Sequence, residues 1–556
     1  MLYPYKNLEN YTLGALLDRS VALYGERDSF SNVGKKAMSY RELDDKIKSM
    51  VKLLTEKGIN KGDKVAILSE NMPNWPIAYL AITYFGAVAV PILPDFHTAD
   101  VHHILCHSEA KAAFVSNKHL PTIDELDSSN LKFIIQLDEL EILEQYTNTS
   151  HMERIKQKLS HKKELQTTSE NDLAAILYTS GTTGHSKGVM LTHKNLVTNA
   201  LSAFKNISIV PEDVFLSILP LAHTFESTVG MLIPLLHGSS VVYIDKTPTP
   251  SVLLKAFEIV RPTMMLSVPL IIEKIYKNKV LAKLNGSFLT KQLYKLPFIH
   301  KQLNKIAGKK LLETFGGRLR FFGIGGAPLA RYVEEFLYDA HFPYVIGYGL
   351  TETAPLIAGT RLGMERKIGS TGPAMVGVEI KIKDKNPQTG EGEIAVKSPS
   401  VMLGYYKDEE KTKEVFDEDG YFLTGDLGYI DEDDYLFISG RSKNLILGPS
   451  GENIYPEQIE SVINKNEAVL DSLVMQKDGK LVARIHLDYT LIDKMFEAHH
   501  QADEHVKEKI ANYLEEMRIE INTQMASFSK ITKFIEQIEP FVKTPTKKIK
   551  RYLYTE

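Results

Sequence analysis

The sequence predicts a large α/β protein whose parallel sheets are covered by helices, followed by a small α+β C-terminal domain. Short apolar stretches alternate with helical stretches over several hundred residues, a pattern typical of parallel sheets. After about residue 440 this pattern gives way to a hairpin and a long charged helical segment. We therefore expect an N-terminal domain over residues 1–440 and a C-terminal domain over residues 441–556.

Nine apolar stretches of the first domain are predicted to be buried strands. The segments between these strands have the periodicity of helices, as in residues 40–57 and 250–261. The predicted strands are residues 64–68, 87–92, 112–115, 132–135, 173–177, 239–244, 263–267, 319–324 and 343–346.

An uncharged stretch over residues 71–94 is long enough to cross a membrane. Gly86 divides it, however: residues 77–82 are helix-like, and residues 87–90 are typical of a buried parallel strand. A membrane span in a helical protein is helical throughout. We therefore expect a buried helix–strand unit here. Since the N-terminus has no signal-peptide pattern, we expect the protein to be cytoplasmic.

The predicted C-terminal domain contains a hairpin, a helical segment and a basic tail. Residues 472–475 and 481–487 flank an Asp478-Gly479 pair, which favours a tight hairpin turn. A charged helical segment is predicted over about residues 493–525, and residues 541–551 are strongly basic.

The composition excludes several classes of protein. A length of 556 residues indicates more than one domain. The net charge of −4 gives no general attraction to nucleic acid, so we expect no nucleic-acid partner. A single cysteine, Cys106, excludes an internal disulfide framework. We expect its side chain to be a small buried apolar group.

The most informative stretch is residues 178–188, Tyr-Thr-Ser-Gly-Thr-Thr-Gly-His-Ser-Lys-Gly. Its glycines let the backbone approach a polyanion, its hydroxyl and N–H groups are donors, and Lys187 adds a positive charge. These residue types predict a loop that binds phosphates. It is not a Walker loop, because Ser186 stands where that motif needs a second glycine and Gly188 where it needs Ser or Thr.

This loop resembles the phosphate-loop signature of the adenylate-forming superfamily, which includes acyl-CoA synthetases, luciferases and the adenylation domains of peptide synthetases. Further blocks occur in the family's order across nearly the whole chain. They are residues 219–223 (Leu-Pro-Leu-Ala-His), 325–329 (Gly-Gly-Ala-Pro-Leu), 347–353 (Gly-Tyr-Gly-Leu-Thr-Glu-Thr), 424–426 (Thr-Gly-Asp), 440–444 (Gly-Arg-Ser-Lys-Asn) and 546–551 (Thr-Lys-Lys-Ile-Lys-Arg).

The resemblance implies a two-step reaction that uses ATP, Mg²⁺ and coenzyme A (CoA). An acid and ATP give an acyl-adenylate and pyrophosphate, and a thiol then releases AMP. Because an anionic carboxylate attacks an anionic phosphate, positioning and charge neutralisation should dominate the first step. The resemblance also implies that the small C-terminal domain rotates between the two steps about a hinge at Lys443.

The resemblance also implies a role for each matching residue. Lys548, Lys187, His223 and Glu352 are the expected catalytic residues, with Lys548 acting where the carboxylate meets the α-phosphate. Glu352 and Thr179 are the expected Mg²⁺ ligands, since the metal prefers oxygen donors. The expected nucleotide-binding residues are Thr179, Ser180, Gly181, Thr182, Thr183, Gly184, Lys187, Gly325, Gly326, Ala327, Tyr348, Gly349, Thr351, Asp426 and Arg441.

Taken singly, these blocks have ordinary structural explanations. An isolated Thr-Gly-Asp is usually a turn, a lone histidine is usually structural, and a lysine-rich tail is usually a solvated surface. Their occurrence together and in order favours the functional interpretation. The chain departs from the family at Ser186, where a proline is usual, and at Lys547, where a glycine is usual before the catalytic lysine.

The closest resemblance is to long-chain fatty acyl-CoA synthetases, on residues 440–447, 450–456, 220–226 and 544–546. We expect an ATP-dependent ligase that joins long- or medium-chain fatty acids to CoA. The alternatives are an acyl carrier protein as acceptor, a pseudoenzyme that binds nucleotide or fatty acid without turnover, and a luciferase-like oxygenation of the adenylate. The chain length and the oligomeric state stay open, with a dimer as one alternative.

Residues 291–310 combine six lysines with several apolar residues and no acidic residue. Such a segment can dock on an anionic bilayer, where fatty acids partition. The alternative is an ordinary surface helix pair interrupted at Pro297. Docking would make the protein a peripheral protein on the inner face of a membrane.

Overall fold

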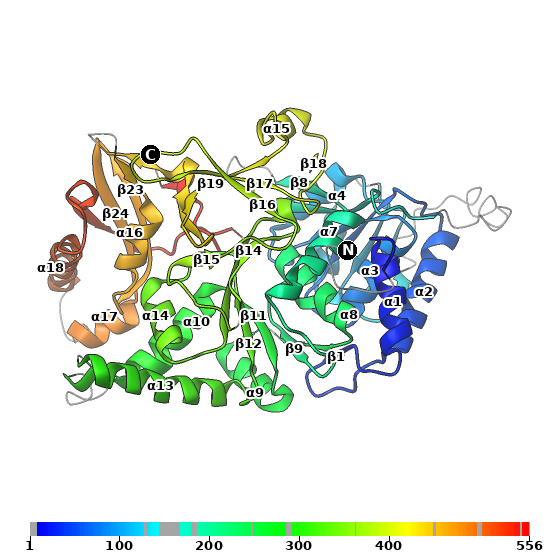
Figure 1. The fold of residues 1–556 in the computed structure, drawn as a ribbon, viewed down its shortest axis with the longest axis horizontal. Helices are drawn as coiled ribbons and strands as arrows, with labels where there is room; N and C mark the ends of the chain where they lie inside the picture. Colours follow the sequence, from blue (N-terminus) through cyan, green and yellow to red (C-terminus); the bar gives the residue numbers. More distant parts are fainter. Residues whose placement is uncertain are drawn as a thin grey trace. The chain divides into compact units, whose positions relative to one another are not determined.

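The computed structural model describes residues 8–126, 130–143, 167–179, 186–246, 248–284, 292–294, 296–361, 363–448, 452–496, 503–544 and 547–554 (Figure 1). The chain forms two compact units. The first comprises Met1–Leu329, Glu334–Ile380 and Val396–Leu423, and the second Ala330–Val333, Lys381–Ala395 and Thr424–Glu556. Each unit is built from three separate segments, so this division is not one boundary in the sequence. The domain boundary at residue 440 stays a prediction.

One sheet of the first unit has eight strands: in order, β18 (Gly404–Tyr405), β8 (Lys187–Thr192), β7 (Leu173–Thr179), β3 (Val88–Ile92), β2 (Lys64–Leu68), β4 (Ala112–Val115), β5 (Phe133–Gln136) and β6 (Glu141–Leu143). Its centre is parallel, because β2 pairs with β3 and β4, and β4 pairs with β5. β7 is parallel to β3 but antiparallel to β8. The edge at β8 and β18 is therefore a hairpin extended by one short strand.

The second sheet of this unit has seven strands: in order, β1 (Phe30–Asn32), β10 (Ser240–Tyr243), β9 (Val214–Ser217), β11 (Met264–Ser267), β12 (Phe321–Ile324), β13 (Tyr344–Gly349) and β14 (Leu356–Gly359). All neighbours are parallel except β13 and β14. The nine predicted strands are all present in these two sheets, with ends that shift by at most three residues. The predicted α/β fold with parallel sheets is confirmed.

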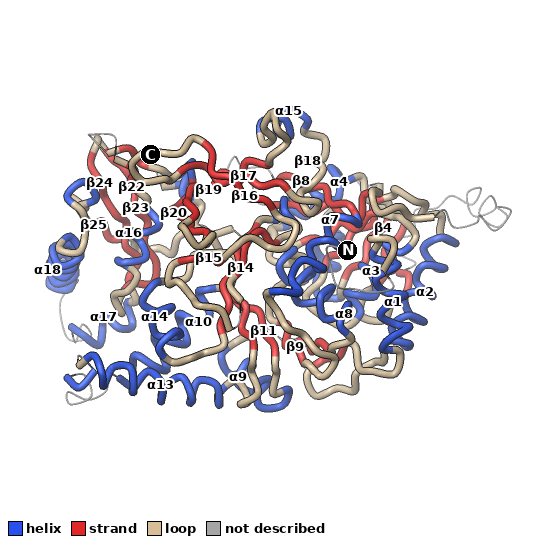
Figure 2. Tube along the Cα trace, viewed as in Figure 1, coloured by secondary structure: helices blue, strands red, loops and turns tan. Residues whose placement is uncertain are grey.

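Helices cover both sheets, as the strand and helix colours of Figure 2 show. The two predicted helices are present as α2 and α9. The described helices are α1 (Leu13–Tyr24), α2 (Tyr40–Glu56), α3 (Asn74–Tyr84), α4 (Thr98–Ser108), α5 (Leu120–Asp124), α7 (His193–Ser202), α8 (Ile233–His237), α9 (Pro250–Val260), α10 (Pro269–Ile275), α11 (Ala282–Leu284), α13 (Pro297–Thr314), α14 (Arg331–Asp339), α15 (Glu409–Glu414), α16 (Pro456–Ile463), α17 (Tyr489–Phe496) and α18 (Asp503–Asn522).

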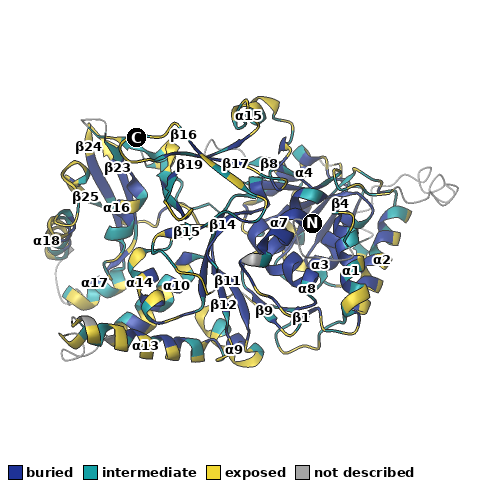
Figure 3. Ribbon diagram, in the orientation of Figure 1, coloured by how far each residue is buried: buried dark blue, intermediate teal, exposed yellow. Residues whose placement is uncertain are grey.

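The uncharged stretch forms the buried helix–strand unit that its sequence predicts. α3 is buried on every side, including Trp75, and β3 is buried along its whole length (Figure 3). Among the described residues, no helix has the length and apolarity needed to span a membrane. The prediction for Cys106 is wrong: its thiol is exposed, because α4 buries the face of Val101, Ile104 and Leu105 instead.

A five-stranded sheet that the sequence does not predict has the order β15 (Ser370–Gly372), β20 (Leu436–Arg441), β19 (Phe422–Ile430), β17 (Gly392–Lys397) and β16 (Glu379–Lys383). The second unit contains the predicted hairpin, β23 (Val469–Lys477) and β24 (Lys480–Leu487), with positive φ at Asp478 and Gly479. β25 (Lys533–Glu536) extends it in parallel, and β21 (Ile446–Leu447) pairs with β22 (Asn453–Ile454). α16, α17 and α18 share its apolar core.

Candidate active site

The predicted phosphate loop connects two antiparallel strands. β7 ends at Thr179 and β8 begins at Lys187, and these two residues are partners across the hairpin. The pairing brings both ends of the loop together. The five other predicted nucleotide-binding residues of this loop lie outside the described residues. A Walker loop is followed by a helix, whereas this one is followed by a strand. The five residues are Ser180, Gly181, Thr182, Thr183 and Gly184.

Lys187 and Glu352 are brought together by Tyr405, a residue that sequence reasoning missed. The Lys187 ammonium lies 5.2 Å from the centre of the Tyr405 ring, within reach of a cation–π interaction. The Tyr405 hydroxyl donates to Oε1 of Glu352 at 2.9 Å. Tyr405 reaches this position because β18 pairs with β8, placing Tyr405 opposite Val189. The position of Tyr405 follows from this strand pairing. It could not be predicted, because a Gly-Tyr pair is not a distinctive sequence pattern.

The turn that presents Glu352 is clamped by a buried asparagine. Glu352 lies in a short 3₁₀ turn, η6 (Thr351–Thr353), directly after β13. Asn199 of α7 donates from Nδ2 to the carbonyl oxygens of Thr353 and Leu356, at 3.1 and 3.0 Å. Its Oδ1 accepts from the amide of Leu356 at 3.1 Å. Asn199 is fully buried, so these bonds satisfy its side chain in a setting where unmade bonds are costly.

A second clamp comes from a π-helix, η4 (Phe225–Leu232). The Thr228 hydroxyl donates to the carbonyl oxygen of Ala354 at 3.0 Å. The last residue of β13, Gly349, has a structural reason to be glycine: a Cβ there would lie 1.8 Å from the carbonyl oxygen of Pro355. Tyr348 and Thr351 flank this tight passage, and Tyr348 is 8% exposed.

The predicted residues Gly325, Gly326 and Ala327 follow the carboxyl end of β12. The amide of Gly325 donates to the carbonyl oxygen of Ser267, at the end of β11, at 3.2 Å. Gly326 has φ +83°, a conformation that favours glycine. Ligands of open α/β sheets bind outside the carboxyl ends of the strands, which is where these residues and Glu352 lie.

His223 lies in the turn before η4. The backbone N–H of Phe225 donates to Nδ1 of His223 at 3.2 Å, which holds the ring against the start of this helix. Two residues later, Phe225 lines an apolar pocket. The structure therefore places His223 at the start of the helix that forms one wall of this pocket.

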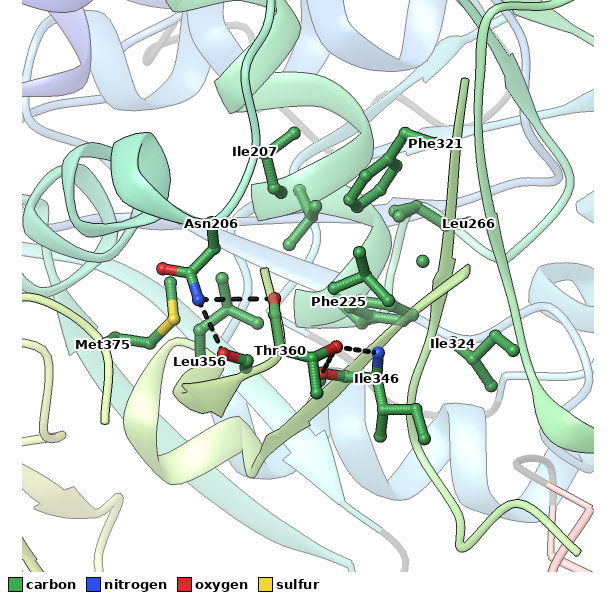
Figure 4. A pocket seen from close by; sticks show the side chains of 15 residues that line it. Asn206, Ile207, Phe225, Leu266, Phe321, Ile324, Ile346, Leu356, Thr360 and Met375 are labelled. Atoms are coloured by element: carbon green, nitrogen blue, oxygen red, sulfur yellow. Dashed lines mark hydrogen bonds between the residues drawn. The ribbon is translucent and has the colours of Figure 1, made fainter. Parts of the chain in front are cut away.

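The pocket lies between η4 and strands of the seven-stranded sheet (Figure 4). A cavity of about 30 Å³ lies between its lining atoms. Asn206 and Thr360 are its polar members, and both are engaged: Asn206 donates to the carbonyl oxygen of Gly359 at 2.7 Å, and Thr360 accepts from the amide of Ile346 at 2.8 Å (Figure 4). The remaining lining residues are Ile207, Phe225, Val229, Leu266, Phe321, Gly323, Ile324, Val345, Gly347, Leu356 and Met375.

A buried carboxyl lies behind the pocket wall. Glu226 of η4 is 1% exposed, and its Oε2 has no hydrogen-bond partner among the described residues. Burial raises the pKa of Glu226 to about 8, although a hydrogen bond with the Ser217 side chain lowers it. Gly230 makes room for this carboxyl, because a Cβ there would lie 2.6 Å from Oε1 of Glu226.

In the second unit, Asp426 and Arg441 form an ion pair. They are partners across β19 and β20, and Nε of Arg441 lies 2.8 Å from Oδ1 of Asp426. Asp426 is 4% exposed, so the arginine offsets a buried charge. Lys443 is exposed in the short turn η7 (Ser442–Asn444) that follows β20.

Lys548 lies on an exposed loop whose preceding residue is strained. Lys547 has φ +63°, a left-handed conformation that costs a non-glycine residue about 1 kcal/mol. The resembled family has glycine at this position, and the backbone gives a physical reason for that glycine. The backbone supports Lys548 as the catalytic lysine in this register, and that role stays a prediction.

Glu352 suits Mg²⁺ better than a metal that needs several side chains. Its carboxylate supplies oxygen, and Tyr405 bonds to only one of its two oxygens. Among the described residues, no group of three or more His, Cys, Asp or Glu could hold a metal ion. Mg²⁺ is commonly held by one or two carboxylates together with substrate phosphates, so the donor set here fits this ion.

Comparisons with known proteins agree on one family. The model of the AMP-binding enzyme family matches residues 17–406. The chain is 32% identical to fatty acyl-CoA synthetase B of Dictyostelium discoideum, over 86% of this chain and 77% of that protein. It is 29% identical to the peroxisomal long chain acyl-CoA synthetase 7 of Arabidopsis thaliana, over 92% of this chain and 79% of that protein.

Solved structures with the same fold cover nearly the whole chain. ATP-bound MatB from Rhodopseudomonas palustris has a TM-score of 0.74 and 26% identity, over 98% of each chain. O-succinylbenzoate coenzyme A synthetase (MenE) from Bacillus subtilis, in complex with ATP and magnesium ion, has a TM-score of 0.72 and 24% identity, over 97% of this chain and 98% of that one. The second likeness shows the fold alone.

The raised pKa of Glu226 predicts that stability falls as pH rises. Above about pH 4.5 the unfolded carboxyl releases its proton, whereas the folded one keeps it up to about pH 8. Each pH unit in this window should lower the free energy of unfolding by about 1.4 kcal/mol. Glu226→Gln keeps the neutral shape and should remove this slope, so the variant should gain stability over the wild type between pH 5 and pH 8.

Urea unfolding at several pH values, followed by fluorescence, measures this difference. Glu258→Gln, at an exposed position on α9, is the matched control. Parallel pH profiles for the wild type and Glu226→Gln would contradict the prediction.

Proposed function

Because the chain belongs to the AMP-binding enzyme family, we propose that it is an AMP-forming fatty acid–CoA ligase that uses ATP and Mg²⁺. The observation that carries the proposal is the set of curated relatives. At 27–32% identity over most of the chain, they are named fatty acyl-CoA synthetases, long chain acyl-CoA synthetases or, in one case, a long-chain-fatty-acid–CoA ligase. The arrangement of Lys187, Tyr405 and Glu352 supports it chemically.

In the first step a carboxylate oxygen of the acid attacks the α-phosphorus of ATP. The bond from that phosphorus to the bridging oxygen breaks, pyrophosphate leaves and the acyl-adenylate forms. Mutual repulsion of the two anions is the main barrier, so positive charge around the reacting atoms matters most. Lys187 would hold the outer phosphates, and Lys548 would stabilise the charge between carboxylate and α-phosphate.

Mg²⁺, when bound, would supply positive charge that offsets part of the charge on the phosphates. Glu352 would hold it, with Thr179 as a further oxygen donor. The Tyr405 hydroxyl keeps one carboxylate oxygen of Glu352 in a fixed direction, which leaves the other for the metal.

In the second step the thiol sulfur of CoA attacks the carbonyl carbon of the adenylate, AMP leaves and a thioester forms. The apolar pocket would hold the acyl chain, since an alkyl chain gains about 0.8 kcal/mol for each buried methylene group. Asp426 and Arg441 would bind the ribose. We propose that the domain boundary lies at residue 440, and that Lys443 is the hinge about which the C-terminal domain turns between the steps.

A panel of acids from acetate to oleate tests this function. We expect fatty acids, and not acetate, to yield pyrophosphate and AMP in equal amounts, with AMP release dependent on CoA. The measurement is the release of AMP, pyrophosphate, ADP and orthophosphate with and without CoA. Orthophosphate and ADP without pyrophosphate would overturn the proposal, no turnover would favour a pseudoenzyme, and turnover with only an acyl carrier protein would change the acceptor.

Lys548→Ala separates the two steps. The variant should lose most adenylate formation, because the charge at the α-phosphate is no longer offset. It should still form thioester from supplied acyl-adenylate, since that step does not involve attack on phosphorus. Pyrophosphate exchange measures the first step and thioester production the second. Equal losses in both would reject this role for Lys548.

We further propose that α13 docks on anionic membrane surfaces. The outward stripe of this helix is both apolar and basic: Phe298 is 76% and Ile306 55% exposed, and Lys301, Lys305, Lys309 and Lys310 are exposed. Its inner side packs closely, because a Cβ on Gly308 would lie 2.5 Å from Ala340. Of the predicted segment, Lys291 and Lys295 lie outside the described residues.

Phe298→Asp combined with Lys305→Glu should abolish flotation with vesicles that contain anionic lipid. The substitutions remove an apolar anchor and reverse one charge of the stripe, each of which weakens surface binding. Lys35→Glu with Lys36→Glu, at exposed loop positions, is the matched control and should float like the wild type. Wild-type flotation that does not depend on anionic lipid would contradict docking.

A further inference from the structure

The predicted catalytic lysine lies on a short closed loop of the second unit. We call the described residues 543–544 and 547–549 the lysine loop. Its ends meet in an antiparallel bridge between Lys543 and Ile549. Within it, the amide of Thr544 donates to the carbonyl oxygen of Lys548 at 2.7 Å, and the amide of Lys548 donates to the Thr544 hydroxyl at 3.1 Å. The backbone of Lys548 is therefore held, although its side chain is exposed.

An arginine anchors the chain just after this loop. Nη2 of Arg551 lies 2.5 Å from Oε2 of Glu460 and 3.6 Å from Oε1 of Glu457, both on α16. Nη1 of the same guanidinium donates to the carbonyl oxygen of Val474 in β23 at 3.2 Å. At the start of the loop, Lys543 bonds to both carboxylate oxygens of Asp471 at 2.7 and 2.8 Å.

Arg551 is half-buried, and its partner Glu460 is buried, so this ion pair differs from one on an open surface. Glu460 is 9% exposed and its Oε1 accepts from the amide of Val474 at 2.7 Å. Burial raises the pKa of Glu460 to about 7, and the Arg551 charge opposes that rise. Removing one partner of such a pair leaves a buried charge unpaired. The planar guanidinium also fixes direction, which a lysine ammonium does not.

One of these carboxylates, Glu457, also contacts the segment beside the proposed hinge. Nδ2 of Asn444 donates to Oε1 of Glu457 at 2.5 Å, and this oxygen is also the one nearest to Arg551. Asn444 directly follows Lys443, the proposed hinge residue. The Glu457 carboxylate on α16 thus contacts both Arg551, just after the lysine loop, and Asn444, the last residue of the turn that contains Lys443.

We propose that Arg551 is a positioning residue for adenylate formation. Its guanidinium, held by Glu457 and Glu460, fixes the direction in which the lysine loop presents Lys548, and the shared carboxylate of Glu457 links that loop to Asn444 beside the hinge. The inference rests on the proposed function of Lys548. It adds a residue that never touches the substrate.

Arg551→Lys tests the proposal, since it keeps the charge and loses the planar, two-sided contact. A displacement of about 1 Å at a reacting group can cost about a hundredfold in rate. We expect pyrophosphate exchange to fall by ten- to a hundredfold, with thioester formation from supplied acyl-adenylate within about twofold of the wild type. An equal loss in both steps would overturn the proposal, because a merely structural role does not separate them.

Arg518→Lys is the matched control. Arg518 bonds to Glu515 and donates to the carbonyl oxygen of Ile531 at 3.0 Å, a similar guanidinium contact elsewhere in the second unit. It should leave pyrophosphate exchange unchanged. Lys548→Ala is measured in parallel: if it forms adenylate normally, the role of Lys548 fails and with it the positioning role of Arg551.

Hydrogen exchange tests whether Arg551 holds the lysine loop in place, and this measurement does not depend on enzyme activity. In Arg551→Lys the amides of Thr544, Lys548 and Lys550 should exchange faster, as should those of residues 442–445, while Arg518→Lys leaves both segments unchanged. Unchanged exchange in Arg551→Lys would overturn the proposal even in an active enzyme. If the wild type forms no adenylate, the proposed function fails, and the exchange result still decides whether Arg551 fixes the loop.

Discussion

The buried side chain of Asn199 is the constraint on which the candidate site depends. Its side-chain amide forms hydrogen bonds with the backbone of Thr353 and Leu356, which follow β13. Asn199 belongs to α7, which starts directly where β8 ends. One fully satisfied amide therefore ties the hairpin that carries Lys187 to the turn that carries Glu352. A side chain without matching donor and acceptor groups would leave buried backbone atoms unpaired, at a cost of about 1–3 kcal/mol each.

In the first unit, the charged residues of the candidate site are separate from the apolar pocket. Charged groups lie at the strand ends, with the aromatic ring and hydroxyl of Tyr405 between the lysine and the carboxylate. Behind them, the pocket is lined almost entirely by apolar groups, and its two polar residues are occupied with backbone bonds. Such a division suits a reaction that joins a water-soluble nucleotide to an apolar acid.

The sequence predicted the parallel strands well, because a strand buried on both faces is a continuous apolar run that needs no partner to be recognised. It missed the five-stranded sheet, because β19 alternates between buried and half-buried positions and β16 has only one buried residue, so neither strand is a continuous apolar run. It missed Tyr405 and Asn199, since their partners lie 53 and more than 150 residues away. Cys106 was wrongly predicted because its residue type, and not its place on α4, decided the expectation.

The close fit between Gly230 and the Glu226 carboxyl makes the two positions interdependent. No side chain can be added at residue 230 while the carboxyl stays where it is. Among related sequences, any that replace this glycine should also have shortened or lost the acid four residues earlier. Substitutions at the two sites should therefore appear as pairs.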